Sequence, residues 1–447
     1  MIIDFFKNLI EYDNKDVEIF GWVETVRVNK KIGFIELNDG STVKNLQLVI
    51  KNTNKYFSLV EKIVIGTSIK VKGKLKCTPG AAQEIELEIE ELNILSLTNN
   101  EYPIQKQFMN LETLREIPHV RHRTKYLRCV MLIRSKLAQN IHEYFSKNNF
   151  LNMHSPIITS NDGEGAGEAF NVFSENEKNF FGNNNATLGV TGQLHAESYA
   201  IGFTKVYTFA PTFRAENSNT KKHLAEFWMI EPEVAFYDLK QIISLADDLL
   251  KKVIFKTIKD LPYEFEYLDQ KSNGLLIEKL NKYLQYDLKI LEYKDAIKVL
   301  EKNKKSFEIQ DIKFGMDLAT EHERFLCEKW ANAPVAIINY PKEIKAFYMY
   351  QNDDKKTVAA FDLLVPGIGE LVGGSQRESR YDLLLKRVRE IGISEGDIQW
   401  YLDLRKFGDS GSSGFGVGFE RLVMYCTDVE NIRDSIPYPR TVNNLRM

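Results

Sequence analysis

The sequence lacks the features that mark membrane, secreted and disulfide-rich proteins. No apolar run approaches the roughly 20 residues that a membrane-spanning helix needs, and residues 1–7 have neither the basic start nor the long apolar stretch of a signal peptide. The cysteines, at positions 77, 129, 327 and 426, lie far apart and form no CxxC pair, which argues against a zinc site and a disulfide framework. We therefore expect a cytoplasmic protein, without a membrane partner, whose thiols are reduced.

A strong net charge of either sign is also missing. The formal net charge is −3, so bulk charge does not indicate a nucleic-acid partner, and any contact with phosphate would depend on local basic patches. With 43% hydrophobic and 27% charged residues, the composition is that of an ordinary globular protein. Because 447 residues exceed the length of one ordinary domain, we expect a small domain and a large one.

The first part of the chain has the alternation of β-strands. Between residues 16 and 95, turn signals separate the strings VEIFGWVETV, GFIELN, LQLVI, SIKVKGKL and IELEIEELNIL. Short strands at this spacing favour a small barrel of the OB type, a frequent binder of single-stranded nucleic acid, although another small β-barrel fits the same pattern. We assign residues 1–98 to this domain and residues 99–125, which carry Pro103 and Pro118, to a connector.

The remaining residues, 126–447, mix helical and strand patterns. Apolar residues at helical spacing predict a helix over residues 126–147, which a short strand closed by Pro156 and a glycine-rich loop follow. Another helix is predicted over residues 238–258. Since no regular βαβ alternation is visible, we expect an α+β domain built on an antiparallel sheet flanked by helices.

Two strings in this part carry candidate chemistry. The strings FRAE and HLAEFWMIE flank a polar loop over residues 217–222, and this predicts a long hairpin on which Arg214, Glu216, Phe227 and Glu231 can share a face. An isolated Arg-x-Glu on a strand is more often a surface ion pair, so the whole string matters. The second string is GFGVGFERL, which is not a Rossmann loop because its spacing is not GxGxxG and no βαβ unit surrounds it.

Taken with their neighbours, these strings resemble the class II aminoacyl-tRNA synthetases. FRAENSNTKKHLAEFWMIEPE resembles motif 2 of that class, GFGVGFERL resembles motif 3, and the helix and strand that end at Pro156 resemble motif 1, which forms the dimer interface. Further strings, among them EGAGEAF, TGQLHAESYA and FDLLVPGIGELVGGSQRE, are similar to the bacterial asparaginyl-tRNA synthetases. The resemblance implies a homodimeric ligase that activates asparagine with ATP and loads it onto tRNA(Asn).

The resemblance also implies a set of ATP-binding residues. Activation is an in-line attack of a carboxylate on the α-phosphate, so the protein has to position charges rather than transfer protons. Arg214 would bind the α-phosphate and the attacking carboxylate, because a guanidinium fork suits both anions. Glu216 would accept from the adenine amino group while Phe227 stacks on the ring. Arg421 would cover the other face and reach the γ-phosphate, and His223 would contact the terminal phosphate.

Family members hold Mg²⁺ through an acidic residue in the segment GIGELVGGSQR. In this sequence that residue is Glu370, and Asp362 is a second candidate, since carboxylate oxygens are hard ligands that suit a hard cation. The resemblance thus makes Arg214, Glu370 and Arg421 the catalytic residues, with ATP and Mg²⁺ as cofactors.

Specificity for asparagine has to come from charge and hydrogen-bond polarity, since aspartate is nearly isosteric. The resemblance implies that Arg377 receives the side-chain oxygen and that Glu164 and Gln193 read the α-amino group. A lysine of the aspartyl enzymes is replaced by Ala196, and Glu231 stands where those enzymes have Asp. The longer Glu231 could accept from the amide NH₂ and repel a carboxylate. Alternatively, Glu231 is a structural salt-bridge partner.

In the barrel, Arg27, Phe34, Gln47 and Glu86 match positions that contact anticodon bases in this subgroup. Stacking on an exposed aromatic is worth roughly 1–3 kcal/mol per base, which makes Phe34 the most consequential of these contacts. Taken alone, Phe34 would more naturally be a residue of the barrel core.

The sequence departs from the family pattern at three positions. Ser412 stands where relatives usually have His, Lys222 where Arg is common, and Gly163 where a bulkier residue is frequent. Alternatives to an asparaginyl enzyme are an aspartyl or non-discriminating synthetase, a catalytically silent RNA-binding paralogue, and an asparagine synthetase on the same catalytic fold. Ala196 and Glu231 count against the first of these.

Overall fold

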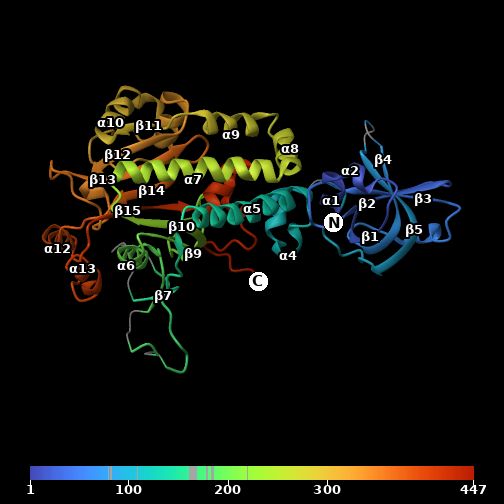
Figure 1. The fold of residues 1–447 in the computed structure, drawn as a ribbon, viewed down its shortest axis with the longest axis horizontal. Helices are drawn as coiled ribbons and strands as arrows, with labels where there is room; N and C mark the ends of the chain where they lie inside the picture. The colour runs from blue at the N-terminus through green and yellow to red at the C-terminus, as the bar shows by residue number, and fades with distance from the viewer. Residues whose placement is uncertain are drawn as a thin grey trace. The chain divides into compact units, whose positions relative to one another are not determined.

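The computed structural model describes residues 1–78, 80, 83–107, 109–160, 169–177, 180–182, 186–218 and 220–447. The chain divides into two compact units (Figure 1). The barrel unit comprises Met1–Ile133 and Leu261–Lys271, and the sheet unit comprises Arg134–Asp260 and Ser272–Met447. The boundaries 1–98, 99–125 and 126–447 inferred from the sequence stay a prediction.

The barrel unit contains a closed barrel in the strand order β1-β2-β3-β5-β4, as the sequence predicted. Its strands are β1 (Asp16–Val28), β2 (Ile32–Asn38), β3 (Leu46–Lys51), β4 (Ser68–Cys77) and β5 (Ile85–Ser96). Apolar residues alternate inward along β4, with Ile69, Val71 and Leu75 fully buried. At Gly73 a Cβ atom would lie 2.1 Å from the carbonyl oxygen of Glu88, so the close approach of β4 and β5 at this register shift requires glycine.

Two helices complete the core of the barrel unit. Helix α1 (Ile2–Lys7) contributes Ile2, Phe5 and Phe6 to the buried cluster. Helix α8 (Pro262–Lys271) belongs to the same unit although it is distant in sequence. Its buried Glu264 accepts from Thr42 Oγ1 and from the backbone N–H of Val43, both at 2.8 Å.

The sheet unit is built on eight strands in the order β11-β12-β13-β14-β15-β10-β9-β6. The six central strands are antiparallel, as expected. The two edge strands pair in parallel, which the sequence did not indicate; β11 and β12 do so because α10 (Tyr293–Lys302) and the segment after it connect them as a crossover. The strands are β6 (Leu151–Asn152), β9 (Lys205–Phe213), β10 (Glu226–Ala235), β11 (Lys289–Glu292), β12 (Val335–Pro341), β13 (Thr357–Val365), β14 (Gly369–Gln376) and β15 (Ser412–Gly418).

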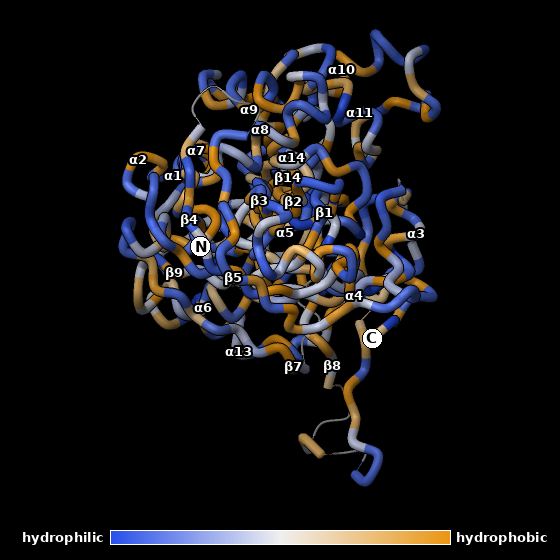
Figure 2. Tube along the Cα trace, turned by 90° about the vertical axis from the view of Figure 1, so that its right-hand side faces the viewer, coloured by the Kyte–Doolittle hydropathy of each residue, from blue (hydrophilic) through white to orange (hydrophobic). Residues whose placement is uncertain are grey.

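Helices cover this sheet. Helix α7 (Leu239–Asp260) runs along β13, β14 and β15, whereas α6 (Gln193–Phe203) and α14 (Phe419–Thr427) pack on β10 (Figure 1). The long helix α5 (Lys125–Lys147) begins one residue before the predicted start. Figure 2 shows hydrophobic and hydrophilic segments alternating along the chain, and in β14 Leu371 and Val372 are buried. The shorter helices include α11 (Thr320–Phe325), α12 (Tyr381–Glu390) and α13 (Gln399–Leu404).

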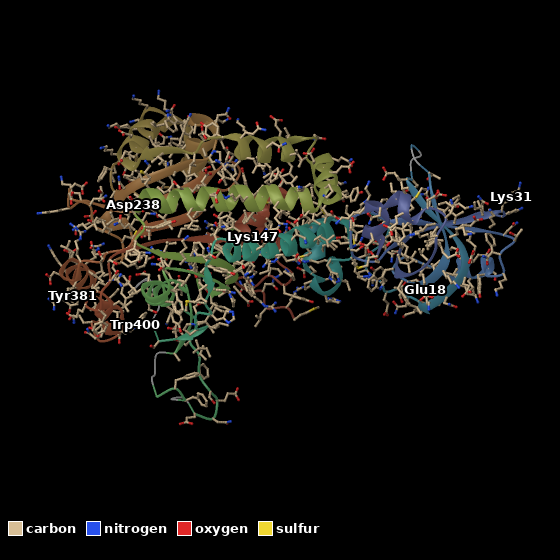
Figure 3. The ribbon with its side chains drawn as sticks, viewed as in Figure 1. Glu18, Lys31, Lys147, Asp238, Tyr381 and Trp400 are labelled. Atoms are coloured by element: carbon tan, nitrogen blue, oxygen red, sulfur yellow. The ribbon has the colours of Figure 1, made fainter. Side chains whose placement is uncertain are left out.

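The outer surface carries the charged side chains. Figure 3 shows Lys31 at the turn between β1 and β2, and Lys147 at the end of α5. The cysteines at positions 77, 129, 327 and 426 are free, and burial raises the pKa of the Cys327 thiol to about 12. Among the described residues, no helix combines the length and the apolar character that crossing a membrane requires.

Candidate functional site

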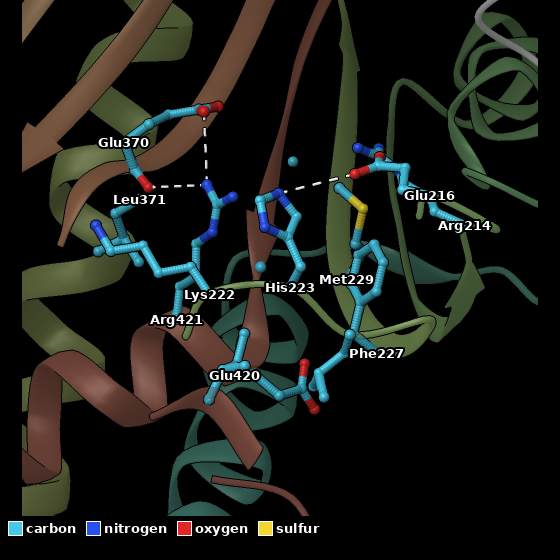
Figure 4. A pocket seen from close by; sticks show the side chains of 14 residues that line it. Arg214, Glu216, Lys222, His223, Phe227, Met229, Glu370, Leu371, Glu420 and Arg421 are labelled. Atoms are coloured by element: carbon cyan, nitrogen blue, oxygen red, sulfur yellow. Dashed lines mark hydrogen bonds and ion pairs between the residues drawn. The ribbon is translucent and has the colours of Figure 1, made fainter. Parts of the chain in front are cut away.

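A hollow in the sheet unit gathers all six residues predicted to bind ATP (Figure 4). We call it the nucleotide pocket, after that predicted role. Its walls come from β10, β14, β15, α14 and the loop after β9. The lining residues are Arg214, Glu216, Lys222, His223, Leu224, Phe227, Met229, Glu370, Leu371, Gly416, Gly418, Glu420, Arg421 and Ile432.

The hairpin of β9 and β10 positions the first group of these side chains. Phe227 and Met229 alternate along β10 toward the pocket, and the Arg214 guanidinium lies 5.6 Å from the centre of the Phe227 ring. His223 Nε2 lies 3.7 Å from a carboxylate oxygen of Glu216 (Figure 4). Burial lowers the pKa of His223. An aromatic face, a carboxylate and a cation thus surround a space suited to a purine ring.

The opposite wall carries an ion pair between motif 3 and β14. Arg421 Nη1 donates to the backbone carbonyl of Glu370 at 3.1 Å and lies 3.5 Å from Glu370 Oε2 (Figure 4). Lys222, the departure in the motif 2 loop, also lines the pocket and donates to the carbonyl of Ile368. Burial lowers the pKa of Lys222. This wall is therefore positively charged and suits phosphate groups.

A second hollow adjoins the first and shares Arg214, Met229, Glu370 and Gly416 with it. We call it the amino-acid pocket. It brings together Gln193, Glu231 and Arg377, which were predicted to read the amino acid, and Asp362. The other lining residues are Thr191, Lys345, Tyr348, Met349, Gly373, Gly374 and Phe415. The predicted Glu164, like Gly163, lies outside the described residues.

Glu231 and Gln193 are fixed at the start of α6. Glu231 is 3% exposed; one of its oxygens accepts from Thr191 Oγ1 and the other from the backbone N–H of Gly192 at 2.9 Å. Gln193 Nε2 donates to Glu197 at 3.1 Å, and because a carboxylate can only accept, the amide oxygen of Gln193 points elsewhere. That oxygen can accept from an ammonium group.

Arg377 is held by a residue that the sequence analysis missed. Its Nε donates to Glu233 Oε2 at 3.1 Å, its Nη2 donates to Glu233 Oε1, and its Nη1 donates to Ser375 Oγ at 2.7 Å. Burial works to lower the pKa of Arg377, but the carboxylate of Glu233 raises it overall. Burial likewise raises the pKa of Glu233, and Arg377 opposes that shift. Ser412, the departure before motif 3, accepts from the Arg377 N–H through its backbone at 2.8 Å.

The two acidic residues predicted to hold Mg²⁺ face a common space above Gly373. A Cβ atom on Gly373 would lie 2.8 Å from Glu370 Oε1 and 3.5 Å from Asp362 Oδ1. Asp362 is partly neutralised by Lys345, whose Nζ lies 2.7 Å away. Within the described ranges no three acidic, His or Cys side chains gather as a ligand set. Two carboxylates with substrate phosphates and water are nevertheless a usual arrangement for Mg²⁺.

In the barrel unit, a third hollow contains all four residues predicted to contact the anticodon. Its lining is Arg27, Val28, Asn29, Phe34, Gln47, Gln83 and Glu86, and we call it the barrel pocket. Strand pairing sets Arg27 opposite Phe34 and Gln47 opposite Glu86, and Gln47 Nε2 donates to Glu86 at 2.5 Å. Phe34 is partly exposed while its neighbour Ile35 is buried, so it is available for stacking.

Comparisons with known proteins agree with this geometry. Residues 110–442 match the family described as tRNA synthetases class II (D, K and N). Residues 17–95 match the OB-fold nucleic acid binding domain. The chain belongs to the class II tRNA synthetases, in the group whose members are designated D, K and N.

Similarity to individual proteins identifies the member of this group that the chain resembles. The chain is 59% identical to the asparagine--tRNA ligase of Mycoplasma mobile, covering 98% of both chains. It is 58% identical to that of Mycoplasmopsis pulmonis, covering 100% of this chain and 99% of the relative. The asparaginyl-tRNA synthetase of Pyrococcus horikoshii, solved with asparaginyl-adenylate, superposes with a TM-score of 0.87 at 31% identity, covering 97% of each chain. The asparaginyl-tRNA synthetase predicted from the sequence is confirmed.

Proposed function

We propose that this enzyme activates asparagine with ATP to asparaginyl-adenylate and transfers it to tRNA(Asn). The observation that carries the proposal is the shared wall of the two pockets. Arg214 lines both the nucleotide pocket and the amino-acid pocket, and a guanidinium fork can bind the α-phosphate and the attacking carboxylate together. The Pyrococcus horikoshii relative, solved with asparaginyl-adenylate, supports the same reaction.

ATP would bind through stacking and charge. Phe227 and Arg421 would hold the adenine between them, and Glu216 would accept from its amino group. His223 and Arg421 would contact the terminal phosphates. The charge that develops on the phosphates would thus be met by preplaced cations, which is the main catalytic contribution in phosphoryl chemistry.

Asparagine would be read by one donor and one acceptor. Arg377 would donate to the side-chain oxygen, and Glu231 would accept from the NH₂ group; both line the same pocket. The α-ammonium group would lie near Gln193, whose Nε2 is used by Glu197 and whose oxygen can therefore accept from the ammonium. An aspartate in this pocket would bring its carboxylate to Glu231, a mismatch that polar sites penalise strongly.

Mg²⁺ would be held by Glu370, with Asp362 behind it, in the space above Gly373. When bound, the ion would neutralise phosphate charge. Glu370 would at the same time keep Arg421 in place through the contact at 3.1 Å.

Residues 1–98 would bind the anticodon through the barrel pocket. Phe34 offers a ring for stacking, and Gln47 and Glu86 offer hydrogen-bond groups to a base edge in an unpaired loop. Arg27 is exposed beside them and would also contact the anticodon bases. These four residues reproduce the combination of stacking and charge that OB folds use on single strands.

Dimerisation would use the strand that follows α5. Leu151, Ile157 and Ile158 are exposed apolar residues in this segment, and they lie in the part of the sequence that resembles motif 1. Covering them in a second copy would remove an apolar edge from water.

Pyrophosphate exchange into ATP, with asparagine or aspartate as the sole amino acid, tests the proposal. We expect exchange with asparagine and almost none with aspartate. Exchange driven equally by aspartate would indicate an aspartyl or non-discriminating enzyme. No exchange with either would indicate a silent RNA-binding paralogue and would reject the proposed reaction.

A further inference from the structure

A network of buried charges lies behind the amino-acid pocket. Glu233 is fully buried and does not line the pocket, yet both of its oxygens accept from the Arg377 guanidinium. A guanidinium is always charged, and a bidentate contact with it favours the ionised form of this carboxylate. The positive charge of Arg377 is therefore neutralised by Glu233, which does not line the pocket.

The fold makes room for this carboxylate at motif 3. Strand β15 pairs Gly414 with Glu233, and a Cβ atom on Gly414 would lie only 1.9 Å from Glu233 Oε1. Any other residue at position 414 would displace the carboxylate. The first glycine of GFGVG is thus needed to leave space for the carboxylate of the ion pair, apart from any role of this string in nucleotide binding.

A second ion pair extends the network. Glu197 on α6 lies 3.8 Å from Arg377 Nε and accepts from Arg405 Nη2 at 3.0 Å and from Tyr401 Oη at 2.6 Å. Arg405 in turn donates to the carbonyl of Glu378 at 2.9 Å. Arg405 pairs with both Glu197 and Asp409, so this second ion pair brings no net positive charge toward Arg377.

The net formal charge of the groups at the end of the pocket that would hold the asparagine side chain is then negative. Arg377 supplies one positive charge, and Glu231 and Glu233 supply two negative ones. We propose that Glu233 is a specificity-determining positioning residue, which cancels the charge of Arg377 so that the arginine serves as a hydrogen-bond donor for an amide and does not attract a carboxylate. This inference rests on the proposed function, because it assumes that Arg377 receives the side chain of asparagine.

Glu233 also fixes which N–H groups of Arg377 are presented. Of the five N–H groups of a guanidinium, Nε and one on Nη2 are used by Glu233, and one on Nη1 is used by Ser375. Among the contacts of the described residues, one N–H of Nη1 and one of Nη2 are then left to serve as donors toward the pocket that Arg377 lines. Removing Glu233 would leave the positive charge of Arg377 unbalanced, which favours a carboxylate, and would free the guanidinium to turn.

The test compares the ratio of kcat/KM for asparagine to that for aspartate in pyrophosphate exchange. In Glu233→Gln this ratio should fall by about tenfold or more, because aspartate gains while asparagine loses, whereas the KM for ATP should change by less than about twofold. A residue needed only for folding would lower the exchange with both amino acids in proportion and leave the ratio unchanged. That result would overturn the proposal.

Glu378→Gln provides a matched control. Glu378 is also buried and binds Arg380 through both oxygens at 2.7 Å, but it does not line the amino-acid pocket. Its loss should leave the ratio unchanged; an equal drop in this variant would contradict the proposal. If Glu233→Gln does not fold, Glu197→Gln should lower the ratio in the same direction by a smaller factor, and an unchanged ratio there would also overturn it. Failure of the unmodified enzyme to activate asparagine would instead reject the proposed function.

Discussion

The nucleotide pocket and the amino-acid pocket share a wall but hold their polar groups differently. In the nucleotide pocket the side chains of Glu216 and His223 are 43% and 41% exposed. In and behind the amino-acid pocket, Arg377 and Glu233 are 3% and 0% exposed and are paired with each other. A large polyanion can be held by stacking and charge in a partly solvated site. Telling an amide from a carboxylate requires dry, fixed groups, because only there does a mismatched partner carry its full cost.

The strongest way to break this comparison is to remove the arginine that lines both pockets. Arg214→Ala should lower the rate of activation by about 10³-fold, because the α-phosphate and the attacking carboxylate lose their common donor. Pyrophosphate exchange measures this loss. Arg389→Ala, which removes a surface arginine paired with Glu395, is the control and should be silent. A normal rate of pyrophosphate exchange in Arg214→Ala would show that Arg214 takes no part in the activation step.

Shortening the acceptor in the amino-acid pocket should affect one substrate only. Glu231→Asp should reduce kcat/KM for asparagine by about 10²-fold, because the carboxylate no longer reaches the amide NH₂. The KM for ATP should change by less than about twofold. Equal losses for asparagine and ATP would show that Glu231 supports the start of α6 through its contact with Gly192 and does not read the substrate.

The two pockets should also differ in their tolerance of added volume within one motif. Gly414→Ala should lower the free energy of unfolding by about 2 kcal/mol, because the new methyl group meets the fixed carboxylate of Glu233. Gly418→Ala is the matched control: its Cβ would lie 3.7 Å from the flexible chain of Arg421, so its cost should stay below about 1 kcal/mol. Denaturant unfolding measures both, and equal costs would contradict the close approach at Gly414.

The barrel pocket extends the comparison to a more open site, which lies in the barrel unit. Phe34→Ala should raise the KM for tRNA about tenfold, since stacking is worth roughly 1–3 kcal/mol per base, and should leave amino-acid activation unchanged. Phe20→Ala is the control, because Phe20 is an exposed aromatic of the same barrel that does not line the pocket. Aminoacylation kinetics distinguish the two, and unchanged kinetics in Phe34→Ala would remove it from the anticodon contacts.

Much of the fold could be predicted from local patterns. The barrel strands alternate with period two, and the helix α5 has a clear apolar face, so both were found within a few residues. Helix α8 could not be assigned to the barrel unit, because the partners of Glu264 are Thr42 and Val43, about half the chain away. The parallel edge strands were missed for a similar reason: strand direction depends on a crossover and leaves no local trace.

The candidate site, too, could be predicted from the sequence only where its residues stand in a local pattern. Arg214, Glu231 and Arg377 stand in strings that resemble a family, which is how they were predicted to touch a ligand. Glu233, Glu197 and Arg405 support those residues from separate elements, and their charges are buried by tertiary packing that the sequence does not display. The only local hint was the spacing of Glu233, which is two residues beyond Glu231 and therefore on the same face of β10.

Binding of two non-hydrolysable adenylate analogues tests the central claim most directly. One analogue would carry an asparaginyl side chain and the other an aspartyl side chain, so that ATP contacts are equal and only the amide differs. Isothermal titration calorimetry should show the asparaginyl analogue binding about 10³-fold more tightly or better, because Glu231 and Arg377 read opposite ends of the amide. Equal affinities, or a preference for the aspartyl analogue, would contradict the account.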